Sequence, residues 1–196
     1  MQQIYGITIA LEVGDMFTKA KQLIMMYKEE GYTNLLSFGG CEATTGWTTL
    51  LGTLATDSDN EYEGTNCLKI TINSGQTTAF SYRNILSLLN ISKYYLYSGY
   101  VKNYNGTTGM KISVDCKADK GLIVSTSNIT TDYVRKGILL QPSDFDTATE
   151  LTIRSHCDGS AAQYGYFDAL MVNEISVADY AAGVAACLTK YPYKAP

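Results

Sequence analysis

Histidine is almost absent from this chain of 196 residues, and its scarcity excludes whole classes of enzyme. His156 is the only histidine, so any Ser-His-Asp or Cys-His catalytic site would have to use it. A zinc site with two histidine ligands is impossible. Cys157 is adjacent in sequence, but neighbouring strand residues point to opposite faces, so the two do not form a catalytic dyad. We therefore expect a protein that is not an enzyme.

Basic residues and long apolar runs are also scarce. The 15 Lys+Arg against 19 Asp+Glu leave a net charge of −4, whereas binding to nucleic acid depends on basic patches. We therefore expect no nucleic-acid partner. No run of 18 apolar residues is present, so we expect no membrane insertion.

The five cysteines lack any C-x-x-C pair, which excludes the common metal-ligand spacing. The chain shows no signal-peptide pattern. These two features together favour assembly in a reducing bacterial cytoplasm, with the cysteines as small core residues rather than disulfides.

Tyrosine and glycine, by contrast, are abundant. The chain has 16 Tyr and 17 Gly, and 45% of its residues are hydrophobic while only 17% are charged. A disordered chain needs low hydrophobicity and high net charge, so an ordered domain is expected. Tyrosine contacts partners over a large area at low entropic cost. The composition therefore favours an all-β domain with a recognition surface.

The hydrophobic pattern divides the chain into three parts. Residues 1–33 combine an alternating segment with a helical one, which predicts a strand and a helix. Residues 34–176 contain many short strands separated by Gly-rich and Asn-rich turns, a pattern typical of a β-sandwich jelly roll. Residues 177–196 predict a short helix at Val177–Lys190, which Pro192 ends, followed by a tail.

The predicted strands of the central part are short and regularly spaced. They are Gly46–Leu54, Cys67–Asn73, Thr77–Leu88, Tyr94–Asn103, Met110–Cys116, Leu122–Ser127, Val134–Leu140, Glu150–Ser155 and Tyr166–Asn173. The segments between them lack room for repeated crossover helices, so a parallel α/β sheet is not expected.

Four sequence motifs follow one another along the central part of the chain. They are Asn34-Leu35-Leu36 with Glu42 and Gly46-Trp47, then Tyr62–Ile70, Lys93–Lys102 and Tyr166–Val172. Together they span roughly residues 34–175 and resemble a carbohydrate-binding-module-like (galactose-binding-like) jelly roll. Cys41 stands where that family usually has Phe, and Phe38 where Asn or Pro is usual. Such modules are common on glycoside hydrolases and on bacteriophage tail or baseplate proteins.

The resemblance implies a function in recognition. The additional segments at both ends favour a non-catalytic glycan-recognition module of a phage or prophage structural protein, which binds host-surface carbohydrate. This interpretation places the chain in a virion, with itself or other virion subunits as partners. Two alternatives remain open, namely a purely structural assembly domain without sugar binding and an accessory module of a polysaccharide-degrading enzyme.

The resemblance also implies a structural calcium ion. Its ligands would be Glu42, Asp168 and backbone near Gly64. Calcium takes six to eight oxygen ligands and prefers anionic ones from separate segments. The alternative is that Glu42 is a solvated turn residue and Asp168 a local hydrogen-bond partner.

Aromatic side chains are the remaining candidates for a binding surface. Aromatic rings are amphipathic, and binding pockets combine apolar surfaces with a few polar groups, so rings can stack on the C–H faces of sugars. The family register places Tyr95 and Tyr97 in the core. The rings predicted to bind glycan are Trp47, Tyr82, Tyr100 and Tyr104. Ordinary packing is the alternative for each of them.

Overall fold

The computed structural model of the protein describes residues 32–104, 109–117, 121–126, 130–145 and 148–196. The chain divides into two compact units, Met1–Thr33 and Asn34–Pro196. The strand and helix predicted within residues 1–33 lie outside the described residues. The account below therefore concerns the second unit.

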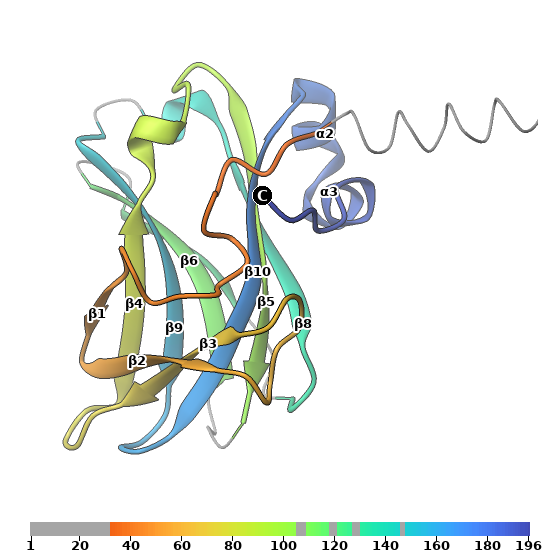
Figure 1. Cartoon of the computed structure of the whole chain (residues 1–196). Helices are drawn as coiled ribbons and strands as arrows, with labels where there is room; N and C mark the ends of the chain where they lie inside the picture. The colour runs from red at the N-terminus through yellow and green to blue at the C-terminus, as the bar shows by residue number, and fades with distance from the viewer. Residues whose placement is uncertain (1–31, 105–108, 118–120, 127–129, 146–147) are drawn as a thin grey trace, which may run out of the picture. The chain divides into compact units, whose positions relative to one another are not determined.

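The second unit is an all-β sandwich of two five-stranded antiparallel sheets (Figure 1). Sheet A has the strand order β1-β4-β9-β6-β7, with bounds Thr48–Leu50, Thr78–Asn84, Glu150–Asp158, Gly109–Lys117 and Gly121–Thr126. Sheet B has the order β2-β3-β10-β5-β8, with bounds Gly52–Asp57, Cys67–Ile72, Tyr164–Ile175, Tyr94–Asn103 and Val134–Leu140. The predicted fold class is confirmed.

The prediction of a single strand at Gly46–Leu54 is wrong, because the chain passes from one sheet to the other within this segment. β1 pairs with β4 in sheet A, while β2 pairs with β3 in sheet B. The turn falls at Leu51, whose φ of 60° is uncommon for a residue with a side chain. Gly52 follows, where a Cβ would lie 2.4 Å from the Ala79 Cβ. The hydrophobic pattern carries no sign of this crossing.

The strand predicted at Thr77–Leu88 is too long. β4 ends at Asn84, and a short 3₁₀ helix, η1 (Leu86–Leu88), follows. The Asn84 side-chain oxygen accepts a hydrogen bond from the Leu86 N–H at 3.0 Å, which turns the chain. A second 3₁₀ helix, η2 (Pro142–Asp144), follows β8.

The core lies between the two sheets and contains two of the tyrosines. Tyr95 is 1% exposed and Tyr97 is fully buried, as the register of this strand predicts. The Tyr95 hydroxyl accepts from the Asn90 N–H at 2.8 Å, so its polar end is satisfied. Burying an aromatic or aliphatic side chain of this kind contributes on the order of 2 kcal/mol. These two tyrosines therefore stabilise the fold and are not available for a binding surface.

The C-terminal helix is two helices rather than the single one predicted. They are α2 (Val177–Ala182) and α3 (Val184–Lys190), separated by Gly183 with φ +87°. Ser176 caps α2 by accepting the Asp179 N–H at 3.1 Å. α2 packs on β5, and α3 packs on β5 and β8 (Figure 1). The helices therefore cover part of sheet B.

Among the residues described, the structure has no helix that is both long and apolar enough to cross a membrane.

Candidate functional site

The outer face of sheet A carries a cluster of rings. Phe80 and Tyr82 alternate with buried residues along β4, so both point away from the core. His156 lies opposite Phe80 on β9, and Arg154 lies opposite Tyr82. Strand alternation and antiparallel pairing thus place four side chains side by side. We call Phe80, Tyr82, Arg154 and His156 the sheet A patch.

The rings of the sheet A patch are in contact. Phe80 stacks on His156 with centroids 5.3 Å apart and lies 6.2 Å from the Tyr82 ring. The guanidinium carbon of Arg154 lies 5.1 Å from the Phe80 centroid and 5.7 Å from that of Tyr82. These distances allow cation–π attraction, which holds the arginine beside both rings. All four residues are half-buried.

Ion pairs surround the sheet A patch. Arg154 pairs with Asp115 on β6, and Lys111 on β6 pairs with Asp158 on β9. Burial raises the pKa of Asp158, but hydrogen bonds from Lys111 and Thr78 outweigh it, so the pKa is lowered overall. The face therefore presents fixed donors and acceptors next to its rings.

The single histidine is neutral at physiological pH. Burial lowers the pKa of His156 to about 4; Asp158 raises it, while Arg154 and Lys111 lower it further. Its Nε2 lies 2.5 Å from the Ser113 hydroxyl oxygen. Cys157 is fully buried and points to the core. The two residues face opposite ways, as the sequence predicts.

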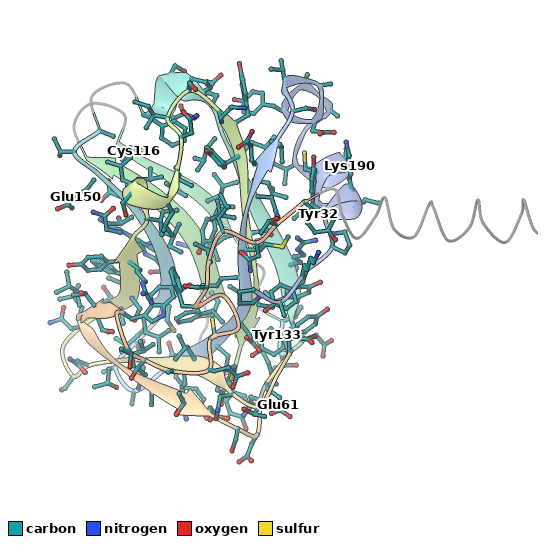
Figure 2. All side chains as sticks on the ribbon, turned by 45° about the horizontal axis from the view of Figure 1, so that its top comes forward. Tyr32, Glu61, Cys116, Tyr133, Glu150 and Lys190 are labelled. Atoms are coloured by element: carbon teal, nitrogen blue, oxygen red, sulfur yellow. The ribbon has the colours of Figure 1, made fainter. Side chains whose placement is uncertain are left out.

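A cavity of about 390 Å³ lies beside Tyr82 at one end of the sheet A patch. Its lining is polar and includes Thr48, Arg83, Asn84, Glu150 and Thr152. Glu150, at the start of β9, is labelled in Figure 2. The cavity adds a carboxylate, an amide and hydroxyl groups to the aromatic surface.

The predicted glycan-binding residues lie in different parts of the domain. Tyr82 belongs to the sheet A patch. Trp47 instead packs inward, with its ring 5.8 Å from Phe38 and 5.4 Å from Phe167 in edge-to-face contacts. Tyr100 lies on β5 of sheet B, where the Tyr62 ring stacks on it at 3.7 Å. Only Tyr82 of these three presents its ring with other rings on the outer face of sheet A.

Tyr104 belongs to a separate cluster at the end of β5. The residue is 51% exposed, and its ring stacks on Tyr164 at 5.0 Å, with Tyr166 edge-on at 6.1 Å. The Lys69 ammonium lies 3.9 Å from the Tyr164 centroid. This cluster is on sheet B, so Tyr82 and Tyr104 do not form one site.

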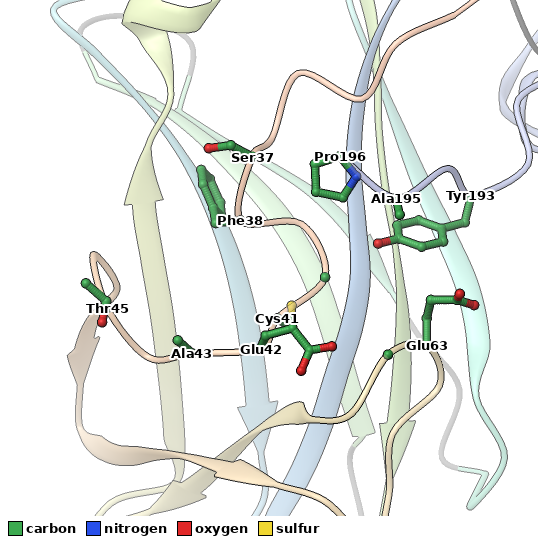
Figure 3. Close-up of a pocket in the computed structure, with 12 residues that line it drawn as sticks. Ser37, Phe38, Cys41, Glu42, Ala43, Thr45, Glu63, Tyr193, Ala195 and Pro196 are labelled. Atoms are coloured by element: carbon green, nitrogen blue, oxygen red, sulfur yellow. The ribbon is translucent and has the colours of Figure 1, made fainter.

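The three predicted calcium positions meet at one loop (Figure 3 shows Glu42 beside it). The Glu42 carboxylate accepts the Thr65 N–H at 2.9 Å and the Thr65 hydroxyl at 2.7 Å. Asp168 Oδ2 accepts the N–H groups of Tyr62 and Glu63 at 2.8 and 3.1 Å. Gly64 lies between Glu63 and Thr65 in sequence. The carboxylates of Glu42 and Asp168 therefore hold the loop that contains Gly64.

The carboxylates at the predicted calcium site already accept hydrogen bonds in this structure. Calcium takes six to eight oxygen ligands, so an ion here would have to share these carboxylates with the N–H groups that donate to them. Within the described part of the chain, no cluster of three or more His, Cys, Asp or Glu side chains is placed to hold a metal ion. Burial is the main cause that raises the pKa of Asp168 to about 6. The hydrogen bonds from Thr65, Tyr62 and Glu63 therefore hold this loop to Glu42 and Asp168.

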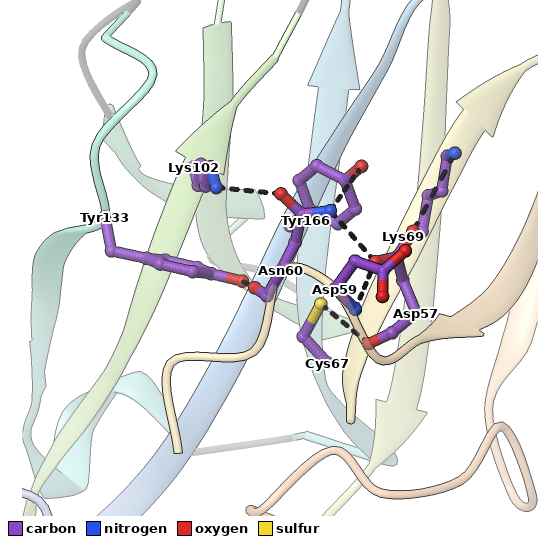
Figure 4. A network of polar contacts seen from close by, with 8 residues as sticks. All are labelled: Asp57, Asp59, Asn60, Cys67, Lys69, Lys102, Tyr133 and Tyr166. Carbon is purple, nitrogen blue, oxygen red and sulfur yellow. Dashed lines mark hydrogen bonds and ion pairs between the residues drawn. The ribbon is translucent and has the colours of Figure 1, made fainter. Parts of the chain in front are cut away.

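The outer face of sheet B is partly covered by the loop that follows β2 (Figure 4). Asn60 on this loop accepts a bond from Lys102 at 2.9 Å, and its backbone oxygen accepts the Tyr133 hydroxyl at 2.6 Å. Its amide donates to the Tyr166 hydroxyl at 3.2 Å. With α2 and α3 over another part, the polar and aromatic groups of sheet B mainly bind other parts of the chain.

The sequence pattern located only part of the sheet A patch. The alternation along β4 places Phe80 and Tyr82 on one face. Arg154 and His156 come from β9, whose pairing with β4 spans more than 70 residues of sequence and leaves no local signal. Only the tertiary structure brings them together.

No protein-family model and no curated protein matches the chain. Solved structures share its fold. The CBM22-1 xylan-binding domain of Paenibacillus barcinonensis Xyn10C is 18% identical with a TM-score of 0.57, over 74% of this chain and 96% of that one. Family 16 Carbohydrate Binding Module-2 is 18% identical with a TM-score of 0.56, over 71% and 99%.

A phage protein has the same fold in part of its chain. The enzymatically active domain of bacteriophage CBA120 tailspike protein 4 is 16% identical with a TM-score of 0.52. The match covers 72% of this chain and 21% of that one. The described domain thus has the jelly-roll fold of carbohydrate-binding modules, as the motifs imply.

Proposed function

We propose that this domain recognises glycans without catalysis, through the sheet A patch. The observation that carries the proposal is the set of two adjacent rings, Phe80 and Tyr82, with Arg154 beside both. Helices α2 and α3 pack on strands of sheet B and not on this face of sheet A. The shared fold with a xylan-binding domain supports the proposal.

The physical basis is stacking combined with prearranged polar groups. The C–H face of a sugar ring packs on aromatic side chains, and its hydroxyls need donors and acceptors nearby. Asp115 holds Arg154, and Asp158 holds Lys111, so these groups lose little freedom on binding. We infer binding rather than catalysis because both carboxylates are ion-paired and His156 is partly buried.

We further propose that the chain is a phage or prophage structural protein that binds host-surface carbohydrate. In that setting it would act in a virion or be assembled in the bacterial cytoplasm, with copies of itself or other virion subunits as partners. The tailspike domain with the same fold supports this setting. The xylan-binding domain supports the alternative of an accessory module.

Affinity electrophoresis against bacterial surface polysaccharides and xylans tests both proposals. We expect retardation by at least one polysaccharide. The Phe80→Ala and Tyr82→Ala variants should each bind about tenfold more weakly, because a stacked ring contributes roughly 1 kcal/mol or more. Tyr104→Ala, at an exposed ring on sheet B, is the control and should bind normally.

Each other outcome of this experiment is informative. No retardation by any polysaccharide would favour the structural assembly domain. Loss of binding in Tyr104→Ala alone would move the site to sheet B. Binding to xylan but not to bacterial polysaccharides would favour the accessory module of an enzyme.

Calcium remains a prediction of the sequence that melting can test. A ligand bound only by the folded state raises its stability. A melting temperature that falls when a chelator replaces calcium would support an ion at Glu42 and Asp168. The same melting temperature in calcium and in chelator would contradict the predicted calcium ion. The loop would then be held by its hydrogen bonds alone.

A further inference from the structure

Arg83 differs from the other cations on this side of the domain. Arg154 and Lys111 are each paired with a carboxylate. Arg83 lines the cavity beside Tyr82, and no Asp or Glu of the described residues forms an ion pair with it. Burial lowers the pKa of Arg83, and no neighbouring carboxylate raises it again. Arg83 thus carries a positive charge that the described part of the protein does not offset.

The guanidinium of Arg83 is nevertheless held in one position. Its carbon lies 3.6 Å from the ring centroid of Phe38, which is a close cation–π contact, and Nη1 donates to the Thr45 carbonyl at 3.2 Å. Phe38 and Thr45 belong to the loop before β1 (Figure 3). Gly46 follows with φ +81°, and a Cβ there would lie 2.8 Å from the guanidinium carbon. The side chain is therefore placed before a ligand arrives, which lowers the entropic cost of binding.

Most hydrogen-bond donors of this guanidinium remain available to a ligand. A guanidinium has five N–H donors in a planar fork, and the fork matches the two oxygens of a carboxylate. Among the residues that the structure describes, the Thr45 carbonyl is the one acceptor for Arg83. Arg83 can therefore still donate two parallel N–H groups to a carboxylate.

The other polar groups of the cavity suit the hydroxyls of a sugar. Glu150, at the start of β9 (Figure 2), offers carboxylate oxygens that accept several hydrogen bonds. The Asn84 side-chain oxygen accepts the Leu86 N–H at 3.0 Å, which leaves the amide N–H groups of Asn84 as donors. Thr48 adds a hydroxyl. The cavity thus combines one cation, one anion and neutral polar groups in about 390 Å³.

A sugar that carries a carboxylate fits this combination better than simpler ligands do. A neutral sugar would leave Arg83 without an anionic partner. A small inorganic anion would offer no ring to pack on Tyr82 and no set of hydroxyls for Glu150. A sugar acid supplies the anion, the ring and the hydroxyls together.

We propose that the sheet A patch, together with this cavity, binds an acidic glycan whose carboxylated sugar unit lies in the cavity. Arg83 donates two N–H groups to the carboxylate, Glu150 accepts from a ring hydroxyl, and the sugar packs against Tyr82. The carboxylate belongs to a uronic acid or to a sialic acid. This inference rests on the proposed glycan recognition and adds the chemical class of the glycan.

Calorimetric titration of the full chain with tetrasaccharides tests this proposal. The acidic probes are tetragalacturonate, a hyaluronan tetrasaccharide and an α2,8-linked sialic acid tetramer. Their methyl esters keep the same skeletons without the charge. We expect at least one acidic probe to bind about tenfold or more tightly than its ester, because a hydrogen bond between charged groups is lost in the ester. The probe that binds most tightly distinguishes a uronic acid from a sialic acid.

Substitutions assign the preference to Arg83. Arg83→Gln should bind the acid and its ester with similar affinity, and Arg83→Lys should keep only part of the preference, because it retains the charge without the fork. Lys136→Gln is the matched control, since it removes one positive charge from β8 of sheet B and should bind as the wild type does. The comparison of acid and ester in the wild type needs no substitution, so it holds even if Arg83→Gln folds poorly.

The outcomes separate this proposal from glycan recognition itself, which neutral xylotetraose also probes. Equal binding of acid and ester by the wild type, or binding of xylotetraose alone, would overturn the acidic class and keep glycan recognition. Equal losses in Arg83→Gln and Lys136→Gln would overturn the role of Arg83. The absence of binding by every tetrasaccharide would contradict both proposals.

Discussion

Gly64 is the residue where backbone conformation and space for a side chain are both most restrictive. Its φ is +79°, a region that residues with a side chain rarely adopt. A Cβ at this position would lie 1.8 Å from Glu42 Oε1. The carboxylate could not keep its bonds to Thr65 if that Cβ were present. The glycine therefore allows Glu42 to hold the loop.

Gly64→Ala should lower the free energy of unfolding by about 3 kcal/mol, since backbone strain and the loss of carboxylate bonds combine. Gly75→Ala is a matched control, because Gly75 has φ +77° but nothing within 4 Å of its Cβ position. Gly75→Ala should lower the free energy of unfolding by about 1 kcal/mol, from backbone strain alone. Denaturant unfolding measures both. Equal losses would show that Glu42 does not restrict this position.

Two residues make stability depend on pH in opposite directions. His156 has a folded pKa of about 4 against an ordinary 6.5, so between these values only the unfolded chain binds the proton. The free energy of unfolding due to His156 then rises with pH. Asp168 has a folded pKa of about 6 against 3.8, so in that window only the folded chain binds the proton, and its contribution falls with pH.

The His156→Gln variant should therefore lose the rising contribution of His156 between pH 4 and 6.5, so its free energy of unfolding should rise less with pH than that of the wild type. Urea unfolding at pH steps from 4 to 7 measures this. Asp168→Asn serves as the opposite control. It removes the contribution that falls with pH, so the free energy of unfolding should rise more steeply with pH than in the wild type. Parallel curves for the wild type and His156→Gln would contradict the burial of this imidazole.

At the scale of elements, Arg135 on β8 attaches the C-terminal helices to sheet B. Its guanidinium donates to the Leu188 carbonyl at 2.8 Å, the Tyr191 carbonyl at 2.6 Å and the Ser98 hydroxyl at 2.9 Å. Two of these acceptors lie at the end of α3, where carbonyls lack partners within the helix. One side chain thus holds a helix end and the tail.

Arg135→Met should lower the free energy of unfolding by about 2 kcal/mol or more, because it leaves partly buried acceptors unpaired. The amides of α3 should then exchange hydrogen faster than those of β5. Lys93→Met is the control: its ion pair with Glu174 is exposed, so stability should hardly change. Unchanged protection of α3 would mean that apolar packing alone holds the helix.

At the scale of the whole molecule, every cysteine is buried in the folded domain. Cys41, Cys67, Cys116, Cys157 and Cys187 are all buried free thiols. Burial is the main cause that raises the pKa of Cys67 and Cys116 to about 11 and that of Cys157 to about 12. A thiol that is both buried and protonated reacts slowly.

Ellman's reagent should therefore label none of the five thiols quickly in the native protein and all five in guanidinium chloride. Fast labelling of the native chain would contradict their burial. Fewer than five thiols in the unfolded, unreduced chain would show that disulfides form, contrary to the reducing compartment expected from the sequence.

The sequence alone determined the fold class and most strands, because a two-residue period and turn residues are local properties. It also placed Glu42, Gly64 and Asp168 in one region, through motif order. The tertiary structure decided the rest. It brought Arg154 beside Phe80 and Tyr82, turned Trp47 inward, and covered Tyr100 with Tyr62. These contacts join strands far apart in sequence, and no local pattern encodes which strands will be neighbours.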